Sequence, residues 1–314
     1  MSILTKAHFY DEAAAFKELE AILWPHGPVC PHCGNKKRIY ALQGVRSKPS
    51  TKNPEGVERH GLKKCGACKK QFTVRVGTIF EGSHAPLHKW LQAIHLMCSS
   101  KKGMSSHQLH RVLEVQYNTA WFMSHRIREA MRSGSLAPMG GPGSSGIVES
   151  DETFIGRKKG RPVKAGVAHK QAVLSLVERG GDVRSFHVDK ADAASIMPIV
   201  RENVAKEARI MTDDAGQYRH LHEEYAHEVV RHKKGEYVRD EAHTNTLENY
   251  YSVFKRGMKG VYQHCSEKHL HRYLAEFDFR YNNRSSLGVE DVERSTKAVA
   301  AAKGKRLTYR RIDA

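Results

Sequence analysis

Three acidic residues in the second half of the chain lie where metal-ion chemistry would use them. Asp151 follows the β-prone segment Ile-Val-Glu-Ser, and Asp213 follows the segment Ala-Arg-Ile-Met-Thr at the expected end of a strand. Glu248 lies in the helix-prone segment Thr-Asn-Thr-Leu-Glu-Asn-Tyr-Tyr. A few carboxylates can hold two divalent cations about 3.5–4 Å apart, which activate water and stabilise the leaving oxygen of a phosphodiester. Mg²⁺ (or Mn²⁺) suits such ligands and leaves positions open for water and phosphate.

A helix over residues 244–258 would give Glu248 polar neighbours on one face. The helical period predicts an apolar stripe formed by Leu247, Tyr250 or Tyr251, Phe254 and Met258. It predicts a polar stripe formed by Asn245, Glu248, Ser252 and Lys255. Glu248 and Lys255 are therefore expected on one face, two turns apart, where Lys255 could hold a DNA phosphate as a point charge.

Spacing alone leaves other interpretations open. An aspartate at the end of a strand often forms a turn, as Asp214 could. A glutamate seven residues before a lysine is often part of a solvated helix face. Periodicity does not choose among Glu149, Asp151 and Glu152, nor between Asp213 and Asp214.

Two Cys-x-x-Cys pairs near the N-terminus predict a second kind of metal site. The four residues are Cys30, Cys33, Cys65 and Cys68. Each pair can present two thiolates to one ion, so two pairs give a closed tetrahedral site for structural Zn²⁺. A redox dithiol is the weaker alternative. The other two cysteines, Cys98 and Cys265, lie in helix-like sequence and are expected to be buried reduced thiols.

The charge of the chain indicates the class of its partner. The 314 residues include 52 Lys and Arg against 34 Asp and Glu, a formal net charge of +18. Such a basic protein attracts polyanions, of which nucleic acid is the usual one. The sequence has no apolar stretch of membrane-spanning length and its first residues lack the apolar run of a secretory signal. We therefore expect no membrane partner and a cytoplasmic location, associated with the nucleoid when bound to DNA.

The first half of the chain predicts a short helix, a small β module and a helical segment. Residues 11–24 have helical spacing, and residues 28–80 contain β-prone pieces (38–42, 71–76 and 78–80) around a polar loop. Residues 86–132 predict three helices, the last two resembling a helix-turn-helix with its turn at 114–117. We expect His125, Arg128 and Arg132 on a basic face toward DNA; the alternative is an ordinary helical hairpin with a solvated basic face. Residues 133–146 are expected to be a linker.

The pattern after residue 146 changes to α/β. The expected strands are 147–155, 169–178, 184–189, 207–213 and 228–232. The expected helices are 192–204, 215–224, 244–258, 266–282 and 289–302. Several strands followed by alternating helices and strands predict one mixed sheet with flanking helices.

The order of these motifs resembles one known family. The segment from Val29 to Phe80, with both cysteine pairs, resembles the N-terminal zinc ribbon of IS1595-family transposases. The helical segment ending at Met131 resembles the DNA-binding helices of that family. The segments around Asp151, Asp213 and Glu248, with residues 269–284, resemble its ISXO2-like catalytic domain. The resemblance covers nearly the full chain.

The resemblance implies an RNase H-like fold, in which two carboxylates lie on neighbouring strands and a third on a later helix. It selects Asp151, Asp213 and Glu248, with 34 residues between the last two and Lys255 seven residues after Glu248. Asn245 and His243 are close enough to contribute to the same site. The implied activity is metal-dependent cleavage at the terminal inverted repeats of an insertion sequence and transfer of the 3′-OH ends into target DNA. The basic run from Arg157 to Arg161 would follow the phosphate backbone, or be a solvated basic turn.

The implied organisation has six segments and a homo-oligomer on double-stranded DNA. The segments are an N-terminal helix (1–27), a zinc ribbon (28–82), a helix-turn-helix-like segment (83–132), a linker (133–146), an RNase H-like catalytic domain (147–285), and a C-terminal helix with a basic tail (286–314). Three alternatives remain: a zinc-ribbon and helix-turn-helix regulator without catalysis, an RNase H-like nuclease that cuts without joining, and a decayed or domesticated transposase.

Overall fold

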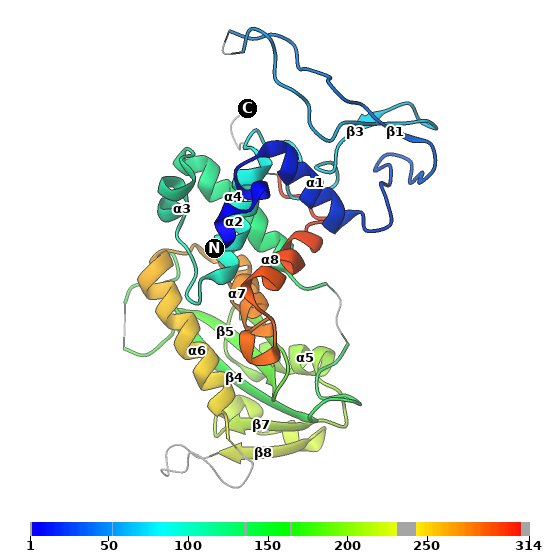
Figure 1. Ribbon diagram of the computed structural model, residues 1–314. Coiled ribbons are helices and arrows are strands. Elements are labelled where there is room, and N and C mark those ends of the chain that lie inside the picture. The colour runs from blue at the N-terminus through cyan, green and yellow to red at the C-terminus, as the bar shows by residue number, and fades with distance from the viewer. Residues whose placement is uncertain (1, 52, 135–136, 164, 231–242, 309–314) are drawn as a thin grey trace. The chain divides into compact units, whose positions relative to one another are not determined.

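The chain folds into two compact units. The computed structural model describes residues 2–51, 53–134, 137–163, 165–230 and 243–308 (Figure 1). Unit 1 comprises Met1–Ser100, Met104–Met131 and Glu290–Ala314, and unit 2 comprises Lys101–Gly103 and Arg132–Val289. In the described part of the chain, no helix is long and apolar enough to cross a membrane. Residues 231–232 of the expected strand, 135–136 of the expected linker and 309–314 of the expected basic tail lie outside the described residues.

A three-stranded antiparallel sheet forms the small β module of unit 1. Its strands are β1 (Ile39–Ala41), β2 (Lys63–Cys65) and β3 (Gln71–Phe72), in that order across the sheet. The sequence did not predict β2, because Lys-Lys-Cys has no β-branched or aromatic residue; its pairing to both neighbours defines it. The expected strand at 78–80 is wrong, since Thr78 forms only an isolated bridge with Lys303 and residues 79–80 form a turn. Of the β-prone piece 71–76, only Gln71–Phe72 form a strand.

Helices make up the rest of unit 1. They are α1 (Glu12–Leu23), α2 (Leu87–Ser99), α3 (Ser106–Leu113), α4 (Tyr117–Met131) and α8 (Asp291–Ala300). The side chain of Asp11 caps α1 by accepting from the Ala14 amide, and the hydroxyl of Ser105 caps α3 by accepting from the Gln108 amide. Helix α2 packs against α1 and α8, so the end of the chain completes the core of unit 1.

The expected DNA-facing side of α4 is only partly accessible. Its apolar face is confirmed, since Ala120, Met123 and Ile127 are buried. However, His125 and Arg128 are also buried, and the Arg128 guanidinium donates to Ser124 Oγ. The expectation that these two residues form an exposed basic face is therefore wrong, and Arg132 alone of the three is exposed.

A five-stranded mixed sheet forms the centre of unit 2. Its strands are β4 (Ile147–Ile155), β5 (Gln171–Glu178), β6 (Val183–Val188), β7 (Arg209–Asp213) and β8 (Ala226–Val230). Their order is β6-β5-β4-β7-β8; β5 pairs antiparallel with β4 and β6, whereas β7 pairs parallel with β4 and β8. This is the RNase H-like arrangement, which confirms the expected fold class.

Helices cover both faces of this sheet. Helix α5 (Ala193–Asn203) packs on one face with Val148, Leu174 and Ile210. Helices α6 (Asn245–Gly257) and α7 (Glu267–Asn282) pack on the other, as the cluster around Val173 and Phe254 shows. Alternate residues of β4 therefore face different helices.

The expected helix at 215–224 is wrong. Two 3₁₀ turns, Gly216–Tyr218 and Leu221–Glu223, occupy these residues. Tyr218 and Leu221 are both fully enclosed in the core on the α5 face. A 3₁₀ turn places side chains three residues apart on one side, so this conformation buries both.

Candidate active site and zinc centre

The four paired cysteines come together in the β module. Their sulfur atoms all lie within 4.8 Å of one another, with 3.7 Å from Cys30 to Cys68 and 3.7 Å from Cys33 to Cys65. All four are free thiols, and Cys30 and Cys65 are buried. Four sulfurs at these separations fit one tetrahedral Zn²⁺ ion. The sequence-predicted ligand set thus forms a structural zinc centre.

Asp151 and Asp213 lie on adjacent parallel strands of the sheet. The β4–β7 pairing ends with Glu149 opposite Met211, and the same register continued by two residues sets Asp151 opposite Asp213. Asp151 precedes Ile155 by four residues, so both side chains point to the same side of the strand. Ile155 packs in the cluster under α6 and α7. Its side chain is therefore on the α6 face of β4.

The electrostatic environment of Asp151 disfavours its charged form. Burial and the nearby carboxylates of Glu152 and Asp213 raise the pKa of Asp151 to about 8, while Lys255 opposes this shift. A hydrogen bond from the Glu152 amide to Asp151 Oδ1 (2.7 Å) also favours the anion. The site therefore gathers negative charge that a cation would neutralise.

Glu152 points to the opposite face of β4 and is held by two donors. Tyr218 donates its hydroxyl to Glu152 Oε1, and Gln217 donates its amide to Oε2 at 2.7 Å. Burial nevertheless raises the pKa of Glu152 to about 7. Glu152 is thus engaged on the α5 side of the sheet, although its charge still acts on Asp151.

Glu149 is fully buried and joins β4 to the start of α6. It accepts hydrogen bonds from the Leu247 amide (3.0 Å) and the Thr246 hydroxyl (2.8 Å), and it pairs with Arg179 Nε at 2.8 Å. The Nδ1 atom of His243 lies 3.3 Å from Glu149 Oε1. Glu149 and His243 therefore fix the first turn of α6, a role that the spacing of the sequence did not reveal.

Helix α6 is also fixed along its length. The hydroxyl of Tyr251 donates to the carbonyl oxygen of Asp151 at 2.5 Å, so the helix contacts the backbone of the acidic residue itself. The hydroxyl of Tyr250 donates to Asp278 of α7 at 2.5 Å. The apolar stripe that the sequence predicted for this helix is confirmed by the burial of its members: Leu247, Tyr250, Tyr251, Phe254 and Met258.

The polar stripe of α6 faces outward. Asn245, Glu248, Ser252 and Lys255 are all exposed, as their spacing predicted. In the described part of the chain, Asp151, Asp213 and Glu248 do not form a cluster with all their ligand atoms within 4.8 Å of one another. The structure thus couples Asp151, Asp213 and Lys255 electrostatically and leaves Glu248 on the exposed face of the helix that follows.

The basic run after β4 is a turn at the surface. Arg157, Lys159 and Arg161 are exposed, and Arg157 Nε donates to the carbonyl of Arg161 at 3.0 Å. Lys158 instead donates to the carbonyl of Asp189 at 2.6 Å. Three cationic side chains therefore remain at the surface near the end of the strand that carries Asp151.

Two domain families match this chain. Residues 10–71 match the transposase zinc-ribbon domain of the IS1595 type, and residues 144–282 match the ISXO2-like transposase domain. A protein of Halobacterium salinarum, described as an uncharacterized protein in transposable element ISH50, is 28% identical over 298 residues, 87% of this chain and 91% of that protein.

A solved structure, "Crystal structure of a pre-cleavage Mos1 transpososome", aligns with 69% of this chain and 79% of its own at 15% identity and a TM-score of 0.20. The domain matches are specific: one contains all four cysteines, and the other contains Asp151, Asp213 and Glu248. The chain therefore belongs to the IS1595 family of transposases, with an N-terminal zinc ribbon and an ISXO2-like transposase domain.

Proposed function

We propose that this chain is a DDE-type DNA transposase. It would cleave DNA at the terminal inverted repeats of an insertion sequence and transfer the 3′-OH ends into target DNA. The observation that carries this proposal is the pair of carboxylates, Asp151 and Asp213, placed on adjacent parallel strands inside the ISXO2-like transposase domain. Burial and the repulsion between the carboxylates raise the pKa of Asp151, and this supports the proposal because a bound cation would relieve the repulsion.

The donor set fits Mg²⁺ or Mn²⁺, because two oxygen ligands with like charge lie together and one of them is largely buried. Asp151, Asp213 and Glu248 would hold the ions. When bound, divalent ions on such carboxylates supply an activated water and stabilise the leaving oxygen. Because Glu248 is exposed on its helix, it remains accessible to DNA and to the ions from solvent.

The remaining side chains would position the DNA and the acids. Lys255 and Asn245, exposed on the same stripe of α6 as Glu248, would contact a phosphate of the strand to be cut. Glu149 and Tyr251 hold this helix on β4. Arg157 and its cationic neighbours would follow the phosphate backbone away from the acids.

The DNA partner would be double-stranded, comprising the terminal inverted repeats and the target. Unit 1 would supply recognition of the repeats through the zinc ribbon (28–82) and the helices of residues 83–132. We propose the same six segments as functional divisions, with residues 147–285 as the catalytic domain. The active form would be a homo-oligomer assembled on DNA in the cytoplasm, because two ends must be joined to one target.

A strand-transfer assay tests this proposal. Pre-cut DNA with the ends of the element, a plasmid target, Mg²⁺ and the purified chain are mixed, and joined products are separated by electrophoresis. Asp213→Asn should abolish joining, whereas its neighbour Asp214→Asn should retain it. Joining that survives in Asp213→Asn would refute the assigned site. Cleavage without joining would instead support the nuclease, and binding without either reaction would support the regulator.

A further inference from the structure

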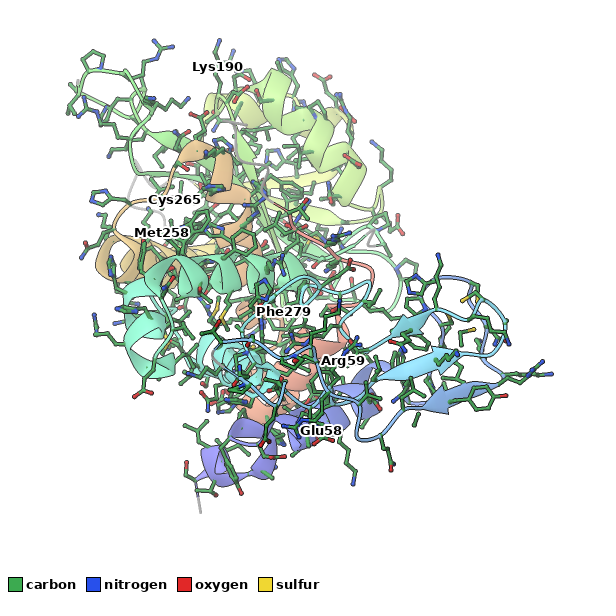
Figure 2. The ribbon with its side chains drawn as sticks, turned by 90° about the horizontal axis from the view of Figure 1, so that it is seen from above. Glu58, Arg59, Lys190, Met258, Cys265 and Phe279 are labelled. Carbon is green, nitrogen blue, oxygen red and sulfur yellow. The ribbon has the colours of Figure 1, made fainter. Side chains whose placement is uncertain are left out.

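A cavity of about 420 Å³ lies at the far ends of β4 and α6 in unit 2. This volume is in the range of small-molecule sites, roughly 300–1,000 Å³. Its lining residues come from the end of β4, the start of β5, the end of α6 and the segment that follows it: Phe154, Ile155, Gly156, Lys170, Gln171, Lys255, Met258, Lys259, Gln263, Cys265 and Leu270. Figure 2 labels Met258 and Cys265 in this part of the unit.

The cavity lining combines apolar and cationic side chains. Ile155, Met258 and Leu270 are buried and supply aliphatic surface, whereas the Phe154 side chain packs in the core on the α5 face and reaches the cavity only at the end of the strand. Three lysines, Lys170, Lys255 and Lys259, supply positive charge, and no carboxylate is among the lining residues. A ligand that matches this surface has a flat apolar ring and an anionic group. A nucleotide has both.

The backbone beside the cavity has an unusual conformation. A π-helical turn, Met258–Tyr262, follows α6 directly, and Gln263 after it adopts φ 56° and ψ −51°. Positive φ is costly for a residue with a side chain, and such turns occur frequently at functional sites. Tyr262 closes the turn by donating to Glu276 Oε1 at 2.5 Å and by packing on Gly103, where a Cβ atom would lie 1.9 Å from the tyrosine hydroxyl. The turn is therefore fixed by its surroundings and directs Lys259 and Gln263 to the cavity.

Cys265 also differs from its sequence-based expectation. It is only partly buried and lines the cavity, so the expected burial is wrong for this cysteine, although it is confirmed for Cys98. The reason is that helical structure ends with the π-helical turn at Tyr262, so Cys265 lies in the irregular residues 263–266 before α7 and not in a helix.

We propose that this cavity receives one unstacked nucleotide of the DNA strand next to the phosphate that is cut. This inference rests on the proposed function. The cavity adjoins the acidic site because both are built on the same strand and helix: β4 carries Asp151 and Phe154, and α6 carries Glu248 and Lys255. The base packs on Ile155 and Met258, which lie on the same face of the sheet, and Lys259 and Lys170 pair with its phosphate. Gln171, whose amide is fixed by Glu267 (3.3 Å) and His187 (3.1 Å), forms one wall.

Photocrosslinking tests where the base binds. The full chain, saturated with zinc but without Mg²⁺, is mixed with a duplex that carries one unpaired 5-iododeoxyuridine, and is irradiated and digested for mass spectrometry. We expect crosslinks at Met258 or Cys265. Crosslinks confined to unit 1 or to Arg157–Arg161 would overturn the proposal. Because no strand transfer is needed, crosslinks in the cavity would stand even if the transposase assay failed.

Affinity measurements separate base binding from general attraction of DNA. Lys259→Ala removes a charged contact to the phosphate of the unstacked nucleotide, so it should weaken binding of the duplex with the unpaired base by about tenfold. It should leave binding of the same duplex fully paired nearly unchanged, because a paired nucleotide does not bring its phosphate into the cavity. The matched control is Lys190→Ala, which removes an exposed lysine of unit 2 outside the cavity lining and should affect both probes equally. Equal weakening of both probes by Lys259→Ala would refute the site. So would undiminished binding of a probe with an abasic position, since that result would assign the cavity to phosphate alone.

Discussion

Replacement of Glu149 by alanine should destabilise unit 2 and loosen the start of α6. Glu149 has a fully buried side chain, and removing it leaves Arg179 without its 2.8 Å partner and the Leu247 amide without its acceptor. Breaking a buried ion pair costs roughly 3–5 kcal/mol. The Arg179 side chain keeps 16% of its surface exposed, so water can partly hydrate the remaining charge. We therefore expect a loss near the lower end, about 3 kcal/mol.

Urea unfolding followed by far-UV circular dichroism gives the free energy, and hydrogen exchange gives its location. Peptides from the first turn of α6 and from β4 should exchange faster in Glu149→Ala, while peptides from β8 should change less. Tryptophan fluorescence adds a separate reporter, because Trp24, Trp90 and Trp121 all belong to unit 1. Glu149→Gln should lose less stability, since an amide oxygen can still accept from the Leu247 N–H group.

Glu224→Ala is the matched control for this measurement. Glu224 forms ion pairs with Arg201 at 2.6 Å and Lys206 at 3.0 Å, as short as those of Glu149, but its partners are more than half exposed. Solvent screens such exposed ion pairs and they contribute little to stability, so this variant should unfold nearly as the parent does. If both variants lost the same small amount, or if exchange in α6 stayed unchanged in Glu149→Ala, our assignment of Glu149 as the anchor of this helix would be refuted.

Three further predictions follow from the described contacts. Purified protein should contain about one zinc ion per chain, and Cys65→Ser should abolish zinc binding and increase exchange in β1–β3; a metal-free protein with an ordered ribbon would contradict the zinc centre. Tyr251→Phe should cost about 1 kcal/mol by removing the donor to the Asp151 carbonyl, and should slow strand transfer without changing DNA affinity; equal loss of both would indicate general unfolding. Burial raises the pKa of Asp278 to about 7, so the folded protein holds this proton more tightly than the unfolded chain does. The stabilisation is therefore fully present below the ordinary pKa of an aspartic acid and is lost as the pH rises through 7. Asp278→Asn should therefore flatten the decline of the melting temperature between pH 5 and 8, and an unchanged slope would exclude this group as the cause.

The sequence predicted the sheet of unit 2 well because its strands are strongly patterned. Strand β4 has the expected bounds, 147–155. The mixed sheet was expected from the succession of strands and helices and from the resemblance of the motifs to an RNase H-like family. The stripes of α6 were also correct, since a helix of 13 residues with a regular period leaves little ambiguity.

The roles of the neighbouring acids could not be predicted because they depend on contacts between distant segments. Glu149 and Asp151 face the same side of β4. Glu149 accepts from the Leu247 amide at the start of α6, nearly a hundred residues later, whereas Asp151 lies next to the strand that carries Asp213. Only the folded chain distinguishes them. The buried state of Arg128 was missed for the same reason, because a basic residue at a helical position looks solvated until the neighbouring helices are in place.

The return of α8 to unit 1 has a consequence for synthesis of the protein. Arg294 of this helix donates to the carbonyl of Cys98 at 3.0 Å, and Ser295 lies 3.2 Å from His95, so the last helix completes a core begun by α2. Protein chains generally fold in the order in which the ribosome releases them. Here the α/β sheet can form while unit 1 still lacks a helix. A premature stop before Glu290 would thus leave the sheet intact and damage the part of the molecule encoded first.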